Sequence, residues 1–254
     1  MRLANKISII TGAGAGIGQS TAFRFAEEGS KLVLADINRA DVDATAREIA
    51  ARGFDVVAVS ADISKEHDAR RISDVAVERF GGLDILVNNA ANFTTFSVED
   101  STVEQWQTVL GVNVIGTAMV AKHAIPHMKR RGKGSIVNVG SMSGIIAQPN
   151  MATYNSSKAA IHIMTRCMAL DLAPFQIRVN TICPGCVLTS ATEREWIKLG
   201  MTREEWISDR AALHMMKRVG EAIEIANAIL FMASDEASFI TAAHLLVDGG
   251  YTGQ

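Results

Sequence analysis

The chain has 254 residues, of which 48% are hydrophobic and 20% charged, with a formal net charge of −2. This charge excludes a nucleic-acid partner from our expectations, because such proteins usually carry a basic excess. Disorder is excluded by the apolar content, and no uninterrupted apolar run approaches the ~20 residues of a membrane span. We expect one dinucleotide-binding and catalytic domain over residues 1–254, located in the cytoplasm.

Apolar strands alternate with amphipathic helices along most of the chain. We expect strands at residues 6–11, 31–36, 55–60, 85–88, 135–139, 177–182 and 244–247, and helices at 17–28, 41–52, 65–80, 103–130, 153–173 and 221–233. The alternation predicts an α/β fold, a Rossmann-like doubly wound parallel sheet of about seven strands with helices on both faces. Residues 189–216 interrupt the alternation of strands and helices with two short, charged helical stretches. We expect this segment to form a lid over the substrate.

A glycine-rich turn joins the first expected strand to the first helix, with glycines at 12, 14, 16 and 18. Glycines allow positive φ and the close approach of a diphosphate, and the following helix start offers unpaired N–H groups. The strict G-x-G-x-x-G spacing is absent, because position 17 is Ile17. The position of the turn between a strand and a helix still predicts a dinucleotide site.

Asp36 ends the second expected strand, 18 residues beyond Gly18. A carboxylate there accepts hydrogen bonds from the adenosine ribose hydroxyls and repels a 2′-phosphate. Arg39 is the one nearby residue that suits NADP, so the charge balance favours NAD and leaves NADP as the alternative.

Cys183 and Cys186 have the C-x-x-C spacing of a redox pair or of half a zinc site. A zinc site needs further ligands at suitable spacing, and the sequence has no second C-x-x-C. We therefore interpret both as ordinary thiols beside a Pro-Gly turn and predict no metal site.

Four motifs in order along the chain resemble the short-chain dehydrogenase/reductase family. They are the glycine turn, Asn88-Asn89-Ala90 after the fourth strand, Ser141 after the fifth, and Tyr154-Asn-Ser-Ser-Lys158 on a helix. Tyr154 and Lys158 are four residues apart, so they share one helix face. A nearby cation favours the phenolate, so we expect Lys158 to lower the pKa of Tyr154 toward working pH.

The resemblance implies a role for four catalytic residues. Tyr154 is implied to be the general acid/base, and Lys158 to bind the nicotinamide ribose. Ser141 would hydrogen-bond the substrate oxygen, and Asn113 would hold a water in a proton relay. The hydride itself passes to or from the nicotinamide.

The resemblance also implies a set of residues around the cofactor and an assembly of four chains. The implied cofactor-binding residues are Gly12, Gly16, Ile17, Gly18, Asp36, Asp62, Ile63, Asn88, Ala90, Tyr154, Lys158, Pro184, Gly185 and Thr189. A homotetramer is implied by the long helices that contain Asn113 and Tyr154. The sequence departs from the usual family pattern at Gly140, Ala91 and Ala242, where Ser, Gly and Gly are common.

Substrate residues are expected in the lid and after Ser141. Candidates for an apolar wall are Met142, Met151, Phe93 and Trp196, and Asn150 or His214 is the candidate for binding a hydroxyl. The expected reaction is the NAD-dependent interconversion of a secondary alcohol (a polyol, sugar, cyclic diol or simple alcohol) and its ketone.

Two alternatives stay open from the sequence. One is an NADPH-dependent 3-oxoacyl-thioester reductase that docks an acidic carrier protein on Arg130, Arg131 and Lys133. The other is a dinucleotide-binding sensor without catalysis.

Overall fold

The computed structural model describes residues 1–254 and contains a seven-stranded parallel sheet in the order β3-β2-β1-β4-β5-β6-β9. This confirms the predicted fold class. The strands are β1 (Ile7–Thr11), β2 (Lys31–Asp36), β3 (Val56–Ser60), β4 (Ile85–Asn88), β5 (Gly134–Val139), β6 (Ile177–Pro184) and β9 (His244–Val247). β6 runs two residues further than predicted because Cys183 and Pro184 pair with Leu246 and Val247 of β9.

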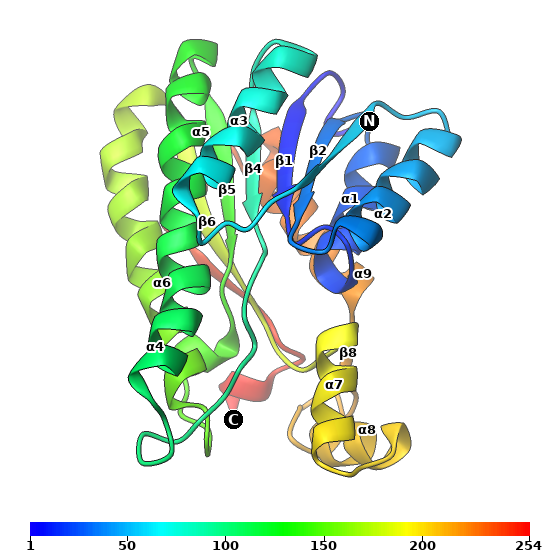
Figure 1. Ribbon diagram of the computed structural model, residues 1–254, viewed down its shortest axis with the longest axis vertical. Helices are drawn as coiled ribbons and strands as arrows, with labels where there is room; N and C mark the ends of the chain where they lie inside the picture. Colours follow the sequence, from blue (N-terminus) through cyan, green and yellow to red (C-terminus); the bar gives the residue numbers. More distant parts are fainter.

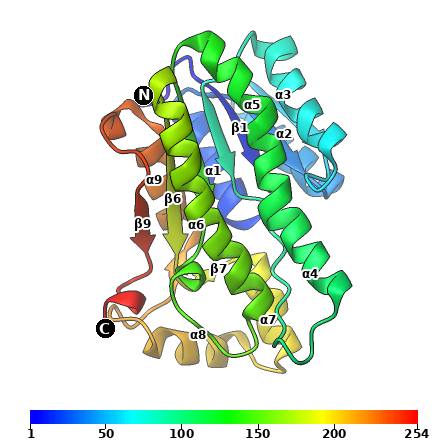
Figure 2. The ribbon, with the colours of Figure 1, turned by 90° about the vertical axis from the view of Figure 1, so that its left-hand side faces the viewer.

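Helices cover both faces of the sheet (Figures 1 and 2). One face carries α1 (Gly16–Glu27), α2 (Arg39–Ala51) and α9 (Ala222–Ala233), and the other carries α3 (Glu66–Phe80), α5 (Thr117–Arg131) and α6 (Ala152–Leu172). Successive strand residues point to opposite faces: Ile10 and Leu34 pack with the first group, whereas Ile9 and Val33 pack with the second. Two buried apolar layers therefore hold the sheet rigidly between the helices.

The predicted long helix after β4 is divided by a π-helical segment. It consists of α4 (Val103–Leu110), the π segment Gly111–Gly116 and α5. This stretch, Val103–Arg131, is long and apolar enough to cross a membrane by composition, with a mean hydropathy of 1.3. Val120, Ala124 and Met128 are fully buried against the sheet, so the structure uses it as a core helix.

The lid projects below the sheet in Figure 1. It contains the two predicted helices, α7 (Ser190–Lys198) and α8 (Arg203–Ala212), each begun by a threonine capping box. The short strands β7 (Val187–Leu188) and β8 (Gly220–Glu221), which the sequence did not predict, pair in parallel and close the base of the lid. Short 3₁₀ turns complete the chain at Met142–Gly144, Ala173–Phe175, Asp235–Ala237 and Tyr251–Gly253.

The strand order reverses between β1 and β4, because β1 continues to β2 on one side and lies beside β4 on the other. In an open parallel sheet, ligands bind outside the carboxyl ends of the strands at such a switch point. The glycine turn, Asp36, Asn88 and Ser141 all follow carboxyl ends of strands, and they therefore share one edge of the sheet.

Candidate active site

The glycine turn between β1 and α1 is built so closely that side chains have no room. Gly12 and Gly16 have φ of +65° and +57°, in the region that favours glycine. A Cβ on Gly18 would lie 2.0 Å from the Gly12 carbonyl oxygen. No side chain caps the first turn of α1, so its amides remain available to an anion, as a diphosphate requires.

The sequence analysis missed the residues that fix this turn to the end of β4. Asn89 Nδ2 donates to the carbonyl oxygens of Thr11 and Gly12, each at 3.0 Å. The Ala90 amide donates to Thr11 Oγ1 at 3.1 Å, and a Cβ on Gly12 would lie 2.8 Å from Ala90 Cα. Asn89 stands in the quoted Asn-Asn-Ala motif, but its partners come from a strand 78 residues away.

Asp36 lies beside the glycine turn, as expected from its place at the end of β2. Its carboxylate accepts from the amides of Gly14 and Asn38, both at 2.9 Å. The Arg39 side chain is 82% exposed and lies 3.5 Å from Asp43, on its own helix. The negative charge therefore lies at the turn and the nearby positive charge points into solvent.

Three more predicted cofactor residues follow the ends of β3 and β4. Asp62 Oδ1 accepts from the amide and hydroxyl of Ser64, at 3.0 and 2.7 Å, so this carboxylate is held by its own loop. Ile63 is buried against Gly116 of the π segment. Asn88 donates to Asn138 Oδ1 at 2.9 Å, while its own Oδ1 is buried without a partner.

Pro184, Gly185 and Thr189 connect β6 to the lid. Gly185 is packed so tightly that a Cβ there would lie 2.8 Å from Asp248 Cα and 3.1 Å from His214 Nε2. Thr189 begins α7, and its side chain would lie 3.3 Å from a Cβ on Gly16. The start of the lid therefore touches the glycine turn.

The structure brings Tyr154, Lys158 and Ser141 together between α6 and the end of β5. Lys158 is only 4% exposed. Its Nζ donates to the Val139 carbonyl oxygen at 2.8 Å and lies 5.6 Å from the centre of the Tyr154 ring. The edge of Phe93 packs against that ring, with centroids 4.8 Å apart.

The expectation that the pKa of Tyr154 is lowered toward working pH is wrong for this state of the protein. Burial raises the pKa of the phenol, and the hydrogen bond with Ser141 opposes this without reversing it. Burial also lowers the pKa of Lys158 to about 8. Desolvation acts against the charged form of both groups and is the largest influence on each pKa.

Asn113 lies in the π segment, and its side chain reaches α6. Its Oδ1 accepts from the Asn92 amide at 2.7 Å, and its Nδ2 donates to the Asn92 carbonyl oxygen and to Ser157 Oγ, at 3.1 and 2.9 Å. Ser157 Oγ in turn donates to the Tyr154 carbonyl oxygen at 2.7 Å. Asn92 and Ser157, which the sequence analysis did not single out, thus connect Asn113 to the helix of Tyr154 and Lys158.

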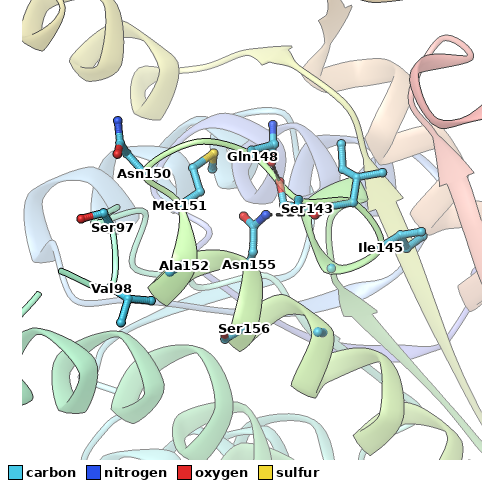
Figure 3. A pocket seen from close by; sticks show the side chains of 14 residues that line it. Ser97, Val98, Ser143, Ile145, Gln148, Asn150, Met151, Ala152, Asn155 and Ser156 are labelled. Carbon is cyan, nitrogen blue, oxygen red and sulfur yellow. Dashed lines mark hydrogen bonds between the residues drawn. The ribbon is translucent and has the colours of Figure 1, made fainter. Parts of the chain in front are cut away.

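The expected substrate residues lie at several separate places, although Asn150 and Met151 line one cavity and Phe93 lies against Tyr154. Met142 is buried, and Trp196 packs on Trp206 with ring centroids 5.6 Å apart. Met151 lines an open cavity of about 580 Å³ (Figure 3) whose lining includes Asn155 and Ser156 but neither Ser141 nor Tyr154. This cavity is therefore separate from the catalytic cluster.

The expectation that His214 binds a substrate hydroxyl is wrong. The residue is 1% exposed. Its Nδ1 donates to the Arg210 carbonyl oxygen at 2.8 Å, and its Nε2 accepts from the Cys186 amide at 3.3 Å. Both ring nitrogens are used to hold the end of the lid against the Pro-Gly loop.

The cysteines Cys183 and Cys186 are both free thiols. Burial raises the pKa of Cys183 to about 12 and that of Cys186 to about 11. Thiolate is the reactive and metal-binding form of cysteine, so the environment of both residues disfavours redox and metal chemistry.

Comparison with known proteins agrees with this geometry. Residues 12–252 match the family model described as enoyl-(acyl carrier protein) reductase. The chain is 36% identical to 2,5-dichloro-2,5-cyclohexadiene-1,4-diol dehydrogenase from Sphingobium indicum, over 99% of this chain and 98% of that protein. It is 38% identical to trans-4-hydroxycyclohexanecarboxylate dehydrogenase from Sinomonas cyclohexanicum, over 99% and 94%.

Among solved structures, a short-chain type dehydrogenase/reductase from Mycobacterium marinum superposes with a TM-score of 0.92 at 31% identity, covering 99% of this chain and 97% of that one. Matches of this extent over the whole chain, on the same fold, leave no part of the molecule outside the likeness. The chain belongs to the short-chain dehydrogenase/reductase family of oxidoreductases, which act on CH–OH groups with a nicotinamide dinucleotide.

Proposed function

We propose that the protein interconverts a secondary alcohol and its ketone with NAD, using Tyr154 as the general acid/base. The observation that carries the proposal is the cluster in which buried Ser141 and Lys158 lie beside the partly buried Tyr154, with Lys158 Nζ 5.6 Å from the centre of the Tyr154 ring. It lies at the carboxyl edge of the sheet, the same edge as the glycine turn. When bound, the dinucleotide supplies the hydride donor or acceptor.

The chain's own residues transfer the proton to and from the substrate oxygen. In the structure described, the Tyr154 phenol holds its proton, because burial raises its pKa. It is therefore ready to donate that proton to a ketone oxygen, while Ser141 hydrogen-bonds the same oxygen and stabilises its developing charge. In the direction of alcohol oxidation the phenol must first lose its proton, and the Lys158 ammonium favours this step.

Asn113 is proposed to complete the proton path beyond Lys158. Its amide is fixed by three hydrogen bonds to Asn92 and Ser157. An amide held in this way keeps one orientation. Asn113 Oδ1 uses one lone pair for the Asn92 amide, and its second lone pair therefore has a fixed direction. This suits a residue that positions a water.

NAD is proposed over NADP on the position of Asp36. Its carboxylate lies within hydrogen-bond distance of the glycine turn, and Arg39 points away to Asp43. A 2′-phosphate would meet this negative charge without a facing cation.

A cyclic secondary alcohol or diol is the proposed substrate class. Two relatives that match nearly the whole chain are named for cyclohexane- or cyclohexadiene-derived alcohols. Phe93 adds a flat apolar surface next to Tyr154, which suits the packing of a ring.

The carrier-dependent 3-oxoacyl-thioester reductase is less well supported, although the matching family model is described as enoyl-(acyl carrier protein) reductase, an activity on a carrier-bound substrate. Arg131 bonds to Asp84, which precedes β4, and Lys133 lies 3.5 Å from Asp235. Both cations are therefore paired at the amino edge of the sheet, opposite Tyr154. A sensor without catalysis is disfavoured by the complete set of Ser141, Tyr154 and Lys158.

Reduction of NAD⁺ and NADP⁺ by the purified protein tests the proposal on a panel of cyclic diols, cyclohexanols, polyols, sugars and acyclic alcohols. We expect the highest kcat/KM with NAD⁺ and a cyclic substrate. Faster turnover with NADP⁺ would contradict the role of Asp36, and a preference for 3-oxoacyl thioesters would favour the carrier-dependent reductase. Cofactor binding without turnover on any substrate would favour the sensor.

A homotetramer remains part of the proposal. The helices α4 to α6 expose large apolar side chains, among them Val103, Ile115, Ile163 and Leu170. Exposed apolar groups on adjoining helices are typical of an interface. Light scattering after size exclusion should give four chain masses, and a single chain mass would contradict this expectation.

A further inference from the structure

His162 is a buried histidine on the catalytic helix with no role in the scheme above. It lies four residues after Lys158 on α6 and is 6% exposed. Residues four apart share a helix face, so Tyr154, Lys158 and His162 form one line along α6.

The imidazole is wedged between the two glycines that flank Ser141. A Cβ on Gly140 would lie 2.6 Å from His162 Nε2, and a Cβ on Gly144 would lie 2.6 Å from His162 Cε1. Gly140 stands where the family commonly has Ser, and the ring, together with Thr181 Cγ2 at 2.6 Å from the same Cβ position, fills the space that this side chain would need.

Two further contacts hold the ring in place. His162 Nε2 lies 3.4 Å from Cys183 Sγ, at the end of β6. His244 of β9 packs over the ring with centroids 4.7 Å apart, and its Nε2 donates to the His162 carbonyl oxygen at 3.1 Å. The imidazole thus joins α6, β6, β9 and the Ser141 segment.

The charges around the ring keep it neutral. Burial and the neighbouring His244, Lys158 and Arg166 lower the pKa of His162 to about 4. Cys183, the remaining titratable group against the ring, keeps its proton because burial raises its pKa to about 12. A protonated thiol and a neutral ring share one hydrogen bond, whose donor is set by the tautomer of His162.

We propose that His162 is a positioning residue for this reaction: its ring, wedged between Gly140 and Gly144 and bound by Cys183, fixes Ser141 and Lys158 relative to Tyr154. The inference rests on the proposed function, since it concerns the geometry of the proposed catalytic residues. It also explains why this chain has Gly140 where Ser is usual.

The kinetic test compares His162→Leu and His162→Gln with the wild type across pH 6 to 10. His162→Leu removes the hydrogen-bonding partner of Cys183, and we expect kcat to fall about 10-fold, the scale of a catalytic group displaced by a fraction of an ångström. The apparent pKa on the rising limb of the pH–rate profile should shift, and cofactor affinity should stay within about twofold. His162→Gln keeps an acceptor and should recover most of the loss.

Leu172→Ala serves as the matched control, because Leu172 is a buried core residue near the far end of the same helix. It should lower Tm without moving the pH profile. If His162→Leu behaves as this control does, with an unchanged pH profile and no greater loss of kcat, His162 is only a core residue and the proposal fails.

A thermal test does not depend on activity. Gly140→Ala should lower Tm in the wild type and lower it less in His162→Ala, because the clashing ring is absent. Equal losses in both backgrounds would contradict the wedge. A wild type that turns over no alcohol would overturn the proposed function but not this coupling, so the two failures are distinguishable.

Discussion

The carboxyl edge of the central sheet, where the strands end, and the amino edge, where they begin, are both rich in polar groups. The two edges use these groups differently. At the carboxyl edge, Asn88 Oδ1 is buried without a partner and the first turn of α1 has no side-chain cap. Lys158 Nζ is held by the Val139 carbonyl oxygen, although an ammonium has three donors. This edge keeps hydrogen-bonding capacity that the fold itself does not use.

At the amino edge a cavity of about 580 Å³ carries more charge, yet its charges satisfy one another. Lys6 and Lys133 lie 3.4 and 3.5 Å from Asp235, and Asp84 accepts from Arg131. Arg178 donates to the carbonyl oxygens of residues 232, 234 and 240. Unused hydrogen-bonding capacity therefore distinguishes the functional edge better than charge or cavity volume does.

Removing the buried cation of the carboxyl edge should have the largest effect on activity. Lys158→Met should lower kcat about 10²–10⁴-fold, the range of an acid–base group, because no other cation lies beside Tyr154 to favour its phenolate. Lys122→Met, an exposed lysine paired with Glu66, should leave kcat unchanged. Steady-state kinetics at saturating cofactor measures kcat for both variants. Equal kcat values would contradict a special role for the buried cation at the carboxyl edge.

Removing the half-buried cation of the amino edge, Arg178, should instead affect stability. Arg178→Met leaves the three carbonyl oxygens that it satisfies without their charged donor, at a cost of about 3 kcal/mol. Lys133→Met breaks only an exposed pair and should cost less than about 1 kcal/mol. Urea unfolding measures both, and kcat per folded molecule should not change. A loss of kcat in Arg178→Met at full folding would show that the amino edge takes part in function.

The pH dependence of stability should show the neutral state of His162. The folded protein resists protonating this ring until about pH 4, whereas the unfolded chain takes up the proton near its ordinary pKa of 6.5. The contribution of His162 to the free energy of unfolding is therefore fully present above pH 6.5. It decreases by up to about 3 kcal/mol as the pH falls to 4. His162→Gln lacks this dependence, so its unfolding free energy should fall less steeply over that window. Parallel curves for the two proteins would contradict the lowered pKa.

The smallest expected effect is a gain in stability next to the last strand. Ala242 has φ of +61°, a conformation that disfavours any residue with a Cβ. Ala242→Gly should therefore stabilise the protein by about 0.5–1 kcal/mol after the entropy of the added glycine is subtracted. A lower Tm for this variant would show that the Ala242 methyl makes contacts worth more than the strain.

Sequence periodicity was sufficient to predict the seven strands of the main sheet and most of the helices, because these follow from local patterns. The division of the long helix at Gly111–Gly116 and the β7–β8 pair were not predictable, since they depend on contacts with Ile63 and with residues across the lid. The same limit applies to the site. Asn89, Asn92 and His162 bind partners that are far away in the sequence, and the pKa of Tyr154 depends on burial, which spacing alone does not reveal.

His214 shows the opposite error. A histidine in a polar segment near the expected substrate region was interpreted as a ligand-binding group, whereas tertiary packing uses both its nitrogens to anchor the lid. The lid is the part of the molecule where local pattern says least about function, because its contacts cross to the Pro-Gly loop and the C-terminal turn.

The central claim is tested most directly by Tyr154→Phe, which removes one hydroxyl from the buried cluster and keeps the ring that packs on Phe93. NAD⁺ reduction by a cyclic secondary alcohol should fall at least about 10³-fold, as expected for loss of the general acid/base, while NADH binding followed by fluorescence stays unchanged. A variant that binds NADH as the wild type does and keeps full turnover would contradict the account.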